Sequence, residues 1–319
     1  MTDPSPLSPI TGKAVSFRAP GGYDVIEIIE RSVRAPAQGE VRIAVAAAAV
    51  NPTDAGLRAT GYPDHASVVP GMDASGTIEA VGPGVSRLKR GDKVMAVVTP
   101  RRPEGGAQGQ HIVVPAASVV TIPAGASLEE AATLPMNGLT ALRALDLAGL
   151  AAGQVLAITG GAGLLARYAA AAAKRRGLRV AADAKPADVD LVRAAGADII
   201  LPRGENYAAA LRREIPGGAD ALLDTALLAE QAFGAIRDGG IYIPVRGWAD
   251  KPSERGIAIK PVFVSQVLDR TAWLELLRDM VEKGEIKLQV SGRYAPEDVA
   301  RAQQALAAGG VRGRPIIVF

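Results

Sequence analysis

Short alternating runs of apolar and polar residues dominate the chain from residue 11 to about residue 120. Turn sequences such as Pro36-Ala37-Gln38-Gly39 and Pro83-Gly84 separate these runs. This spacing is typical of short β-strands joined by tight turns, so we expect a mainly β domain. The expected strands are 13–17, 41–50, 76–81, 93–98 and 111–114.

The pattern changes at Ser127, where Ser127-Leu128-Glu129-Glu130 has the character of a capping box and predicts a helix that runs toward Leu134. From there to about Val245, apolar runs alternate with Ala-rich segments of helical period. Such alternation builds a parallel sheet covered on both faces, as in doubly wound folds. The expected strands are 155–159, 179–182, 199–201, 221–224 and 240–245, and the expected helices are 164–176, 187–195, 207–215 and 228–238.

The last part of the chain repeats helical and extended patterns. We expect a helix over 271–283, an extended stretch over 289–294, a helix over 296–308 and a final strand over 315–319. The pattern alone leaves open which domain this tail joins.

Composition narrows the function classes. The chain has no cysteine and two histidines, His65 and His111, so disulfides, a cysteine nucleophile and a thiolate-bound metal are excluded. The formal charge is +3 and the basic residues are scattered, which predicts no nucleic-acid partner. No apolar run reaches the roughly 18–20 residues of a membrane span, and the N-terminus lacks the order of a signal peptide. We therefore expect a soluble, cytoplasmic protein.

A glycine-rich turn is the sharpest chemical signal. The run 155–159 leads through Gly160-Gly161-Ala162-Gly163 directly into a helical segment that begins Leu164-Leu165-Ala166. A strand that ends in small residues and opens into a helix aims unpaired N–H groups at one point, which suits a pyrophosphate. Ala166 stands at the third glycine position and Leu164 is larger than usual, so a turn without a ligand is the alternative. We predict that Gly160, Gly161, Ala162, Gly163, Leu164 and Leu165 bind the cofactor.

Charged residues follow the next two strands. An acid at such a strand end, here Asp183, can bind a ribose 2′-hydroxyl and favour NAD, whereas a base can bind a 2′-phosphate and favour NADP. Lys185 and Arg203 bring two cations to one edge of the predicted sheet. We therefore predict NADPH, with NADH possible, while solvated loop charges are the alternative interpretation.

Several short motifs occur in the order found in one family. They are Val50-Asn51-Pro52-Thr53-Asp54, Pro70-Gly71-Met72-Asp73-Ala74-Ser75-Gly76, Val81-Gly82-Pro83-Gly84-Val85, Gly91-Asp92-Lys93-Val94, Glu130-Ala131-Ala132-Thr133-Leu134-Pro135, Gly138-Leu139-Thr140-Ala141-Leu142 and Asp238-Gly239-Gly240. With these motifs and the glycine turn, the chain resembles the medium-chain dehydrogenase/reductase superfamily, in its zinc-independent quinone oxidoreductase branch, over nearly its whole length.

The resemblance implies an α/β chain with a GroES-like β-rich domain (residues 1–122 and 262–319) and a Rossmann doubly wound parallel-sheet domain (residues 123–261). The active site is expected between the two, and the family commonly forms homodimers. Zinc-dependent relatives carry a cysteine at the position of Asn51 and a His-Glu pair at Met72-Asp73, so the resemblance implies a site without metal.

The resemblance also assigns roles to residues. It places Asn51 beside the nicotinamide, as a catalytic and cofactor-binding residue, and Tyr62 and Arg58 as a phenol donor and a charge partner for the substrate. The alternative, purely structural interpretations are that Asn51 caps a turn and that Tyr62 packs against a loop. The substrate side is expected to include Asp54 and Arg246, and the remaining cofactor contacts are expected at Thr140, Thr225, Val245, Val262 and Val264.

The chain departs from the family pattern at several points. Gly56 stands where quinone reductases often carry an aromatic residue, and the glycine usual after Asp224-Thr225 is replaced, giving Ala226-Leu227. We expect hydride transfer from NADPH to a small quinone, enone or enoyl substrate. The alternatives are a redox-neutral cyclase or isomerase on the same fold and a non-catalytic, crystallin-like binding protein.

Overall fold

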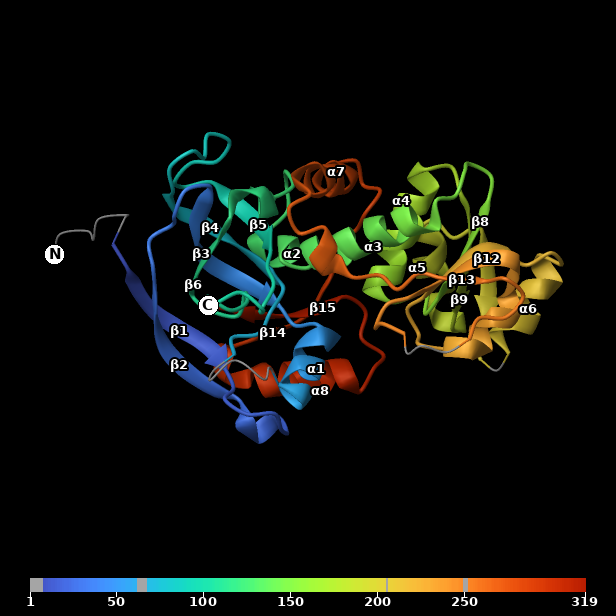
Figure 1. The fold of residues 1–319 in the computed structure, drawn as a ribbon, viewed down its shortest axis with the longest axis horizontal. Helices are drawn as coiled ribbons and strands as arrows, with labels where there is room; N and C mark the ends of the chain where they lie inside the picture. Colours follow the sequence, from blue (N-terminus) through green and yellow to red (C-terminus); the bar gives the residue numbers. More distant parts are fainter. Residues whose placement is uncertain (1–7, 62–67, 205, 249–251) are drawn as a thin grey trace. The chain divides into compact units, whose positions relative to one another are not determined.

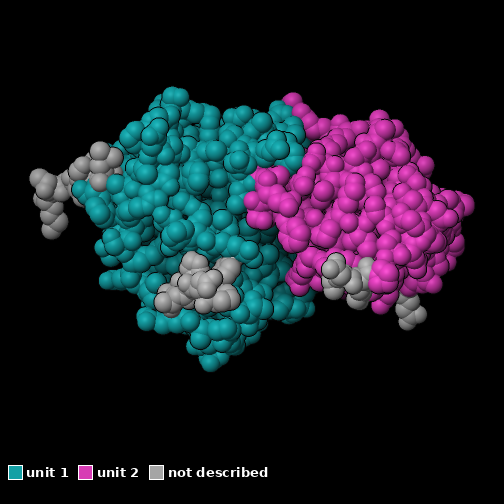
Figure 2. Space-filling view, in the orientation of Figure 1, with its two compact units in different colours: residues 1–136, 268–282, 288–319 teal, residues 137–267, 283–287 magenta. Residues whose placement is uncertain are grey.

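The chain folds into two compact units, described here from a computed structural model that covers residues 8–61, 68–204, 206–248 and 252–319. Unit 1 comprises residues 1–136, 268–282 and 288–319, and unit 2 comprises residues 137–267 and 283–287 (Figure 2). The domain boundaries expected from the sequence lie after residues 122 and 261, and they stay a prediction. No helix in the described ranges is long and apolar enough to cross a membrane.

Eight α-helices are present in the described residues, most of them short (Figure 1). They are α1 (Pro52–Thr60), α2 (Leu128–Ala131), α3 (Pro135–Ala148), α4 (Leu164–Arg175), α5 (Val189–Ala194), α6 (Tyr207–Glu214), α7 (Thr271–Glu282) and α8 (Val299–Ala307). The capping box predicted at Ser127 is confirmed: its hydroxyl accepts from the Glu130 amide, and α2 begins at the next residue.

Unit 1 is built on a seven-stranded sheet with the order β14-β15-β3-β4-β5-β7, and β6 pairs with β3. A separate hairpin is formed by β1 and β2. The strands of this unit are β1 (Ile10–Ser16), β2 (Glu27–Val33), β3 (Glu40–Ala49), β4 (Asp73–Val81), β5 (Lys93–Val97), β6 (His111–Pro115), β7 (Val119–Thr121), β14 (Val290–Tyr294) and β15 (Arg314–Val318).

The C-terminal tail completes this sheet. Residues 316–318 of β15 pair antiparallel with residues 47–49 of β3, and β14 pairs parallel with β15. The pairing of β3 with β4 is so close that a Cβ on Gly76 would lie 1.9 Å from the Ala44 carbonyl oxygen. Only glycine fits there. The sequence-based expectation that the tail forms a strand is confirmed, and the structure assigns that strand to unit 1.

Unit 2 contains a six-stranded sheet in which every pair of neighbours is parallel, in the order β10-β9-β8-β11-β12-β13. The five residues of β8 are all buried, as expected for a central strand covered on both faces. The strands are β8 (Val155–Thr159), β9 (Arg179–Ala184), β10 (Ile199–Pro202), β11 (Ala219–Asp224), β12 (Ile236–Pro244) and β13 (Ala258–Ile259). The doubly wound fold predicted from the alternating pattern is confirmed.

One predicted helix is wrong. Residues 228–238 were expected to be helical, but the structure has a 3-10 helix over Ala229–Ala235 and strand β12 from Ile236 onward. The strand therefore begins before Gly239 and Gly240, and its pairing with β11 shifts register near Ala219. A register shift near glycines interrupts the alternation of apolar and polar residues, so the start of this strand has no strand pattern in the sequence.

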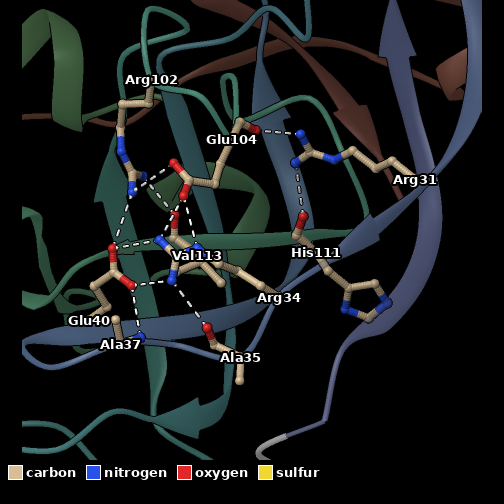
Figure 3. A network of polar contacts seen from close by, with 9 residues as sticks. All are labelled: Arg31, Arg34, Ala35, Ala37, Glu40, Arg102, Glu104, His111 and Val113. Carbon is tan, nitrogen blue, oxygen red and sulfur yellow. Dashed lines mark hydrogen bonds and ion pairs between the residues drawn. The ribbon is translucent and has the colours of Figure 1, made fainter.

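A cluster of ion pairs fixes the loop between β5 and β6 in unit 1 (Figure 3). The guanidinium of Arg34 donates to the carboxylates of Glu40 and Glu104, at 2.5 and 2.6 Å. Arg102 lies 3.5 Å from both carboxylates, and Arg31 donates to the backbone carbonyl of Glu104. The hydrogen bond from Arg34 holds the pKa of Glu40 below its usual value. Burial raises the pKa of Glu104, but Arg34, a backbone amide and the Arg102 charge together lower it below its usual value.

Candidate functional site

The glycine turn leaves the start of α4 open to a ligand. Gly160 has φ +71°, and the Gly163 amide donates to the Gly160 carbonyl, so the chain reverses tightly after β8. Gly163 is the N-cap and carries no side chain to cap the helix, and the first amide to return to the cap is that of Arg167. The amides of residues 164–166 therefore precede the intrahelical ladder. Together with the helix dipole they favour an anion such as a diphosphate.

Close packing explains why the turn needs small residues. A Cβ on Gly161 would lie 2.6 Å from the Asp183 carbonyl oxygen, and a Cβ on Gly160 would lie 2.9 Å from the Thr225 hydroxyl. The turn thus fits between the ends of β9 and β11. Leu164 is 4% exposed, so its side chain belongs to the core of unit 2 and leaves the helix start uncovered.

Asp183 organises this turn from the neighbouring strand. Its Oδ1 accepts from the amides of Gly160 and Gly161, at 2.5 and 3.3 Å, and its Oδ2 accepts from Arg203 at 2.8 Å. The carboxylate is buried, with 6% of the side chain exposed. Sequence reasoning considered Asp183 only as a ribose ligand and missed this role. The available signal was an acid at the end of a buried strand beside the glycine turn.

The two predicted cations lie on the same edge of the sheet. Lys185 directly follows β9, Arg203 directly follows β10, and the two strands pair up to Ala184 and Pro202. Both side chains are exposed, Arg203 to 41%. In the described part of the chain Arg203 has Asp183 as its only acceptor, and Lys185 has none. This leaves a locally positive edge beside the glycine turn.

The other half of the edge is built around Asp224, at the end of β11. Its buried carboxylate accepts from Thr159 Oγ1 at 2.6 Å, from Tyr242 Oη at 2.7 Å and from the Ala229 amide at 2.9 Å. Burial and this carboxylate raise the pKa of Tyr242 above its usual range. Thr225, a predicted cofactor contact, donates its hydroxyl to the Thr159 carbonyl at 2.5 Å and so lies against the glycine turn.

Four further predicted residues lie near the end of β12 or in the segment that pairs with it. Val245 comes directly after the strand, and the exposed Arg246 follows it. The buried Val262 donates its amide to the Pro244 carbonyl at 3.1 Å, and Pro244 is in register with Asp224. Val264 begins the next 3-10 turn. The structure therefore brings these residues to the same end of the sheet as the glycine turn, whereas Thr140 is buried within α3.

The predicted residues of unit 1 form a buried polar network. Asn51 is fully buried and is the N-cap of α1. Its backbone N–H donates to the Asp54 carboxylate and its side-chain Nδ2 donates to the Asp73 carboxylate, both at 2.7 Å. Asp54 also accepts from the Gly71 amide at 3.1 Å and from Gln108 Nε2 at 3.2 Å. Within unit 1 the network anchors the start of α1 to β4.

Both carboxyl groups of this network are hard to ionise. Burial raises the pKa of Asp54 to about 7 and that of Asp73 to about 6, and the nearby Asp73 charge adds to the shift of Asp54. Backbone amides and the Arg314 charge oppose these shifts without cancelling them.

Arg58 lies at the other end of α1 and is also buried. Its Nε donates to Gln303 of α8 at 3.0 Å, another nitrogen donates to the Gly21 carbonyl, and its guanidinium stacks 4.4 Å from the centre of the Tyr23 ring. These contacts tie α1 to α8 and to the segment that precedes β2. Tyr62, the predicted phenol donor, lies outside the described residues.

Two other features of the described residues bear on ligand binding. Among the residues that the structure describes, no three His, Asp or Glu side chains are grouped so that they could hold a metal ion. A cavity of about 160 Å³ lies in unit 1 beside the Arg31, Arg102 and Glu104 cluster, and none of the predicted site residues lines it.

Comparisons with known proteins agree with this architecture. Residues 37–124 match the family model of the alcohol dehydrogenase GroES-like domain, and residues 195–317 match the model named zinc-binding dehydrogenase. A mycobacterial structure complexed with NADPH has the same fold, with a TM-score of 0.84, 24% identity, and coverage of 96% of this chain and 100% of that one.

Two curated relatives are similar in sequence. The chloroplastic NADPH-dependent alkenal/one oxidoreductase of Arabidopsis thaliana is 28% identical over 318 residues, which is 96% of this chain and 79% of that protein. The chloroplastic quinone-oxidoreductase homolog of Spinacia oleracea is 32% identical over 191 residues, which is 57% of each chain. The chain belongs to the medium-chain dehydrogenase/reductase superfamily, in its quinone oxidoreductase-like branch.

Proposed function

We propose that the protein is an NADPH-dependent reductase that transfers hydride to a small quinone or α,β-unsaturated carbonyl compound. The observation that carries the proposal is the open start of α4 flanked by two cations at one sheet edge. It is supported by the similarity to an NADPH-dependent alkenal/one oxidoreductase and to a quinone-oxidoreductase homolog.

The glycine turn and the strand ends would hold the two halves of a dinucleotide at different places along the sheet edge. The amides of residues 164–166 would hold the diphosphate, and Arg203 and Lys185 would hold a 2′-phosphate on the adenosine side. Asp183 already accepts from the turn with one oxygen and from Arg203 with the other, and only 6% of its side chain is exposed, so it is poorly placed to bind a ribose hydroxyl. This arrangement favours NADPH over NADH.

On the other side, the ends of β11 and β12 would hold the nicotinamide half, with Thr225, Val245, Val262 and Val264 as the predicted contacts. When bound, the cofactor supplies the hydride. The task of the protein is to hold the acceptor carbon close to the nicotinamide and to stabilise the negative charge that develops on the acceptor oxygen. Arg246 is exposed at this end of the sheet, and we assign the stabilising charge to it.

The buried residues of unit 1 support the site indirectly in this proposal. Asn51 and Asp54 hold the start of α1 to β4, and Arg58 holds its end to α8. Tyr62 stays the predicted phenol donor to the substrate oxygen.

The cofactor half of the proposal is tested by calorimetric titration of NADPH and NADH. Removing either cation with Lys185→Ala or Arg203→Ala should weaken NADPH binding about tenfold, because a charge-assisted contact to the 2′-phosphate is lost. NADH binding should change less than about twofold in Lys185→Ala, and in Arg203→Ala it should fall less than NADPH binding, because Asp183 loses its partner in that variant. Arg193→Ala is the matched control, since Arg193 is an exposed arginine on α5 that pairs only with Asp190 among the described residues.

The redox half is tested by following NADPH oxidation with a panel of enones and quinones. Equal losses for NADPH and NADH in the two variants would refute the 2′-phosphate assignment. A folded wild-type protein that binds neither nucleotide, or that oxidises NADPH with no member of the panel, would refute the reductase.

A further inference from the structure

Two large hydrophobic side chains stand out on the surface of unit 2. Among the described residues, Leu227 and Phe263 are the only large hydrophobic residues that are exposed, to 45% and 46%. Single exposed apolar residues are common on protein surfaces and need no explanation by themselves. These two differ because of where they lie and because of the backbone of Leu227.

Leu227 is held in a conformation that leucine disfavours. Its φ is +60°, in the left-handed region where the Cβ meets the backbone and where glycine is the natural choice. Ala229 has φ +54° in the same loop. In the free protein Leu227 is 45% exposed, so a large part of its side chain stays in water while the backbone holds this strain. Such a residue points to a role that the free protein does not reveal.

The loop around Leu227 is fixed by buried contacts on both sides. The Ala229 amide donates to Asp224, the Ala226 amide donates to Thr159 Oγ1, and the Thr225 hydroxyl donates to the Thr159 carbonyl. Leu227 therefore cannot relax into a common conformation without breaking these bonds. The loop presents one leucine side chain at a defined place on the surface.

Leu227 lies at the half of the sheet edge opposite Lys185 and Arg203. The strand order changes direction between β8 and β11, which is where open parallel sheets bind ligands. The cations follow β9 and β10 on one side of this point, and Leu227 follows β11 on the other. A Cβ on Gly160 would lie 3.5 Å from Ala226 Cβ, so the Leu227 loop directly adjoins the glycine turn.

Phe263 lies at the same half of the sheet edge as Leu227. It follows Val262, whose amide donates to the end of β12, and a Cβ on Gly247 would lie 4.0 Å from its ring. The ring therefore lies by the loop that leaves β12. Leu227 thus follows β11, and Phe263 lies beside the end of β12, so both are near the two strand ends that are assigned to the nicotinamide half.

We infer that Leu227, with Phe263, forms an apolar contact for the nicotinamide half of the dinucleotide. The inference rests on the proposed function and adds Leu227, which no motif assigned to the site, whereas Phe263 stands between the predicted contacts Val262 and Val264. The nicotinamide ring of NADPH is flat and uncharged, so apolar side chains that cover it bury apolar surface and exclude water from the hydride-bearing carbon. The strain at Leu227 is then offset when the ligand covers the leucine.

A fragment of the cofactor separates the two halves. Adenosine 2′,5′-bisphosphate carries the 2′-phosphate but lacks the nicotinamide, so it should bind the cation side without reaching Leu227. Leu227→Gly should weaken NADPH binding about fivefold, because it removes one partly buried apolar contact. Its affinity for adenosine 2′,5′-bisphosphate should stay within about twofold of wild type.

The matched control is Ala229→Gly. It relieves a left-handed residue in the same loop but removes no large side chain, so it should leave both affinities unchanged. Phe263→Ala lies outside the loop and should repeat the selective loss of NADPH affinity. All four proteins are first compared by thermal unfolding, and both ligands are titrated by calorimetry.

The outcomes distinguish this inference from the proposed function. Unchanged NADPH affinity in both Leu227→Gly and Phe263→Ala, or an equal loss for both ligands, overturns the contact while leaving the reductase proposal in place. A loss in Ala229→Gly equal to that in Leu227→Gly assigns the effect to the loop and also overturns it. Wild-type protein that binds neither ligand overturns the proposed function and this inference together.

Discussion

At the scale of single residues, the carboxylate of Asp183 has the widest influence on the candidate cofactor edge. It holds two amides of the glycine turn with one oxygen and Arg203 with the other. The same side chain thus shapes the turn and positions the cation that we assign to the 2′-phosphate. A buried acid beside a phosphate site is compatible with anion binding because Arg203 balances its charge.

Replacing this group with Asp183→Asn should destabilise the protein by about 1–3 kcal/mol, because the two amides and Arg203 lose a charged acceptor. Urea unfolding at neutral pH measures the loss. Asp190→Asn is the control, since the Asp190 side chain is fully exposed. A variant as stable as the wild type would show that Asp183 does not organise the turn.

Asp54 is the residue whose effect depends on pH. Burial raises its folded pKa from 3.8 to about 7, so the folded protein binds a proton that the unfolded chain releases near its usual pKa. Its contribution to stability is therefore fully present below about pH 3.8 and is lost as the pH rises through about 7.

The test is Asp54→Asn, which keeps the shape of the side chain and removes its ionisation. Between pH 5 and 7.5 the wild type should lose about 2 kcal/mol more unfolding free energy than the variant. Urea unfolding at the two pH values measures the difference. Asp73, whose pKa is also raised, and Arg314 face the same group and are present in both proteins, so the comparison isolates the ionisation of Asp54 and its coupling to them. Parallel pH profiles would contradict the raised pKa.

At the scale of elements, the ion pairs of Arg34 hold the loop between β5 and β6 in place. Glu104 sits in that loop and Arg34 follows β2, so the pair joins segments far apart in the sequence. The lowered pKa of Glu104 means that its contribution is present above its unfolded pKa of about 4.5 and is lost as the pH falls further.

Glu104→Gln should lower the unfolding free energy by about 0.5–1 kcal/mol at pH 7 and by much less at pH 3. High salt should also reduce the difference, because the pairs are partly exposed. The double variant with Arg34→Gln should be little worse than either single variant. Additive losses would mean that the two side chains do not interact.

The strands and helices that the sequence predicted best are those with a clear period. Strand β8 and the start of α4 occur at the predicted residues, because a fully apolar run followed by small residues has few other interpretations. The helix expected over 228–238 is wrong, and the hairpin strand β2 was not expected, because Glu27, Glu30 and Arg31 interrupt its apolar residues. In both cases tertiary pairing, rather than local pattern, decides the structure.

The candidate site was predictable in outline for a similar reason. Backbone amides at a helix start follow from the glycine turn, and the cations follow from the strand ends. The roles of Asp183 and Leu227 were not predictable, because they depend on which side chain reaches a neighbouring strand and on a backbone angle. Asn51 and Asp54 occur at the motif positions, but only the structure reveals that both are buried and bonded to other polar groups.

At the scale of the whole molecule, unit 1 is assembled from segments on either side of most of unit 2. Its sheet includes β3, near the start of the chain, and β15, at residues 314–318. All of the residues of the parallel sheet lie between these two strands in the sequence.

This connectivity sets an order of events during synthesis on the ribosome. The last strand of unit 2 emerges before β15 has been made, so the parallel sheet can form while residues 47–49 of β3 still lack the β15 partner on one side. For that period β3 offers an open edge to other nascent chains. Chaperone demand should therefore fall on the β-rich half, and truncation just before residue 314 should yield an aggregating product whose cofactor half has already folded.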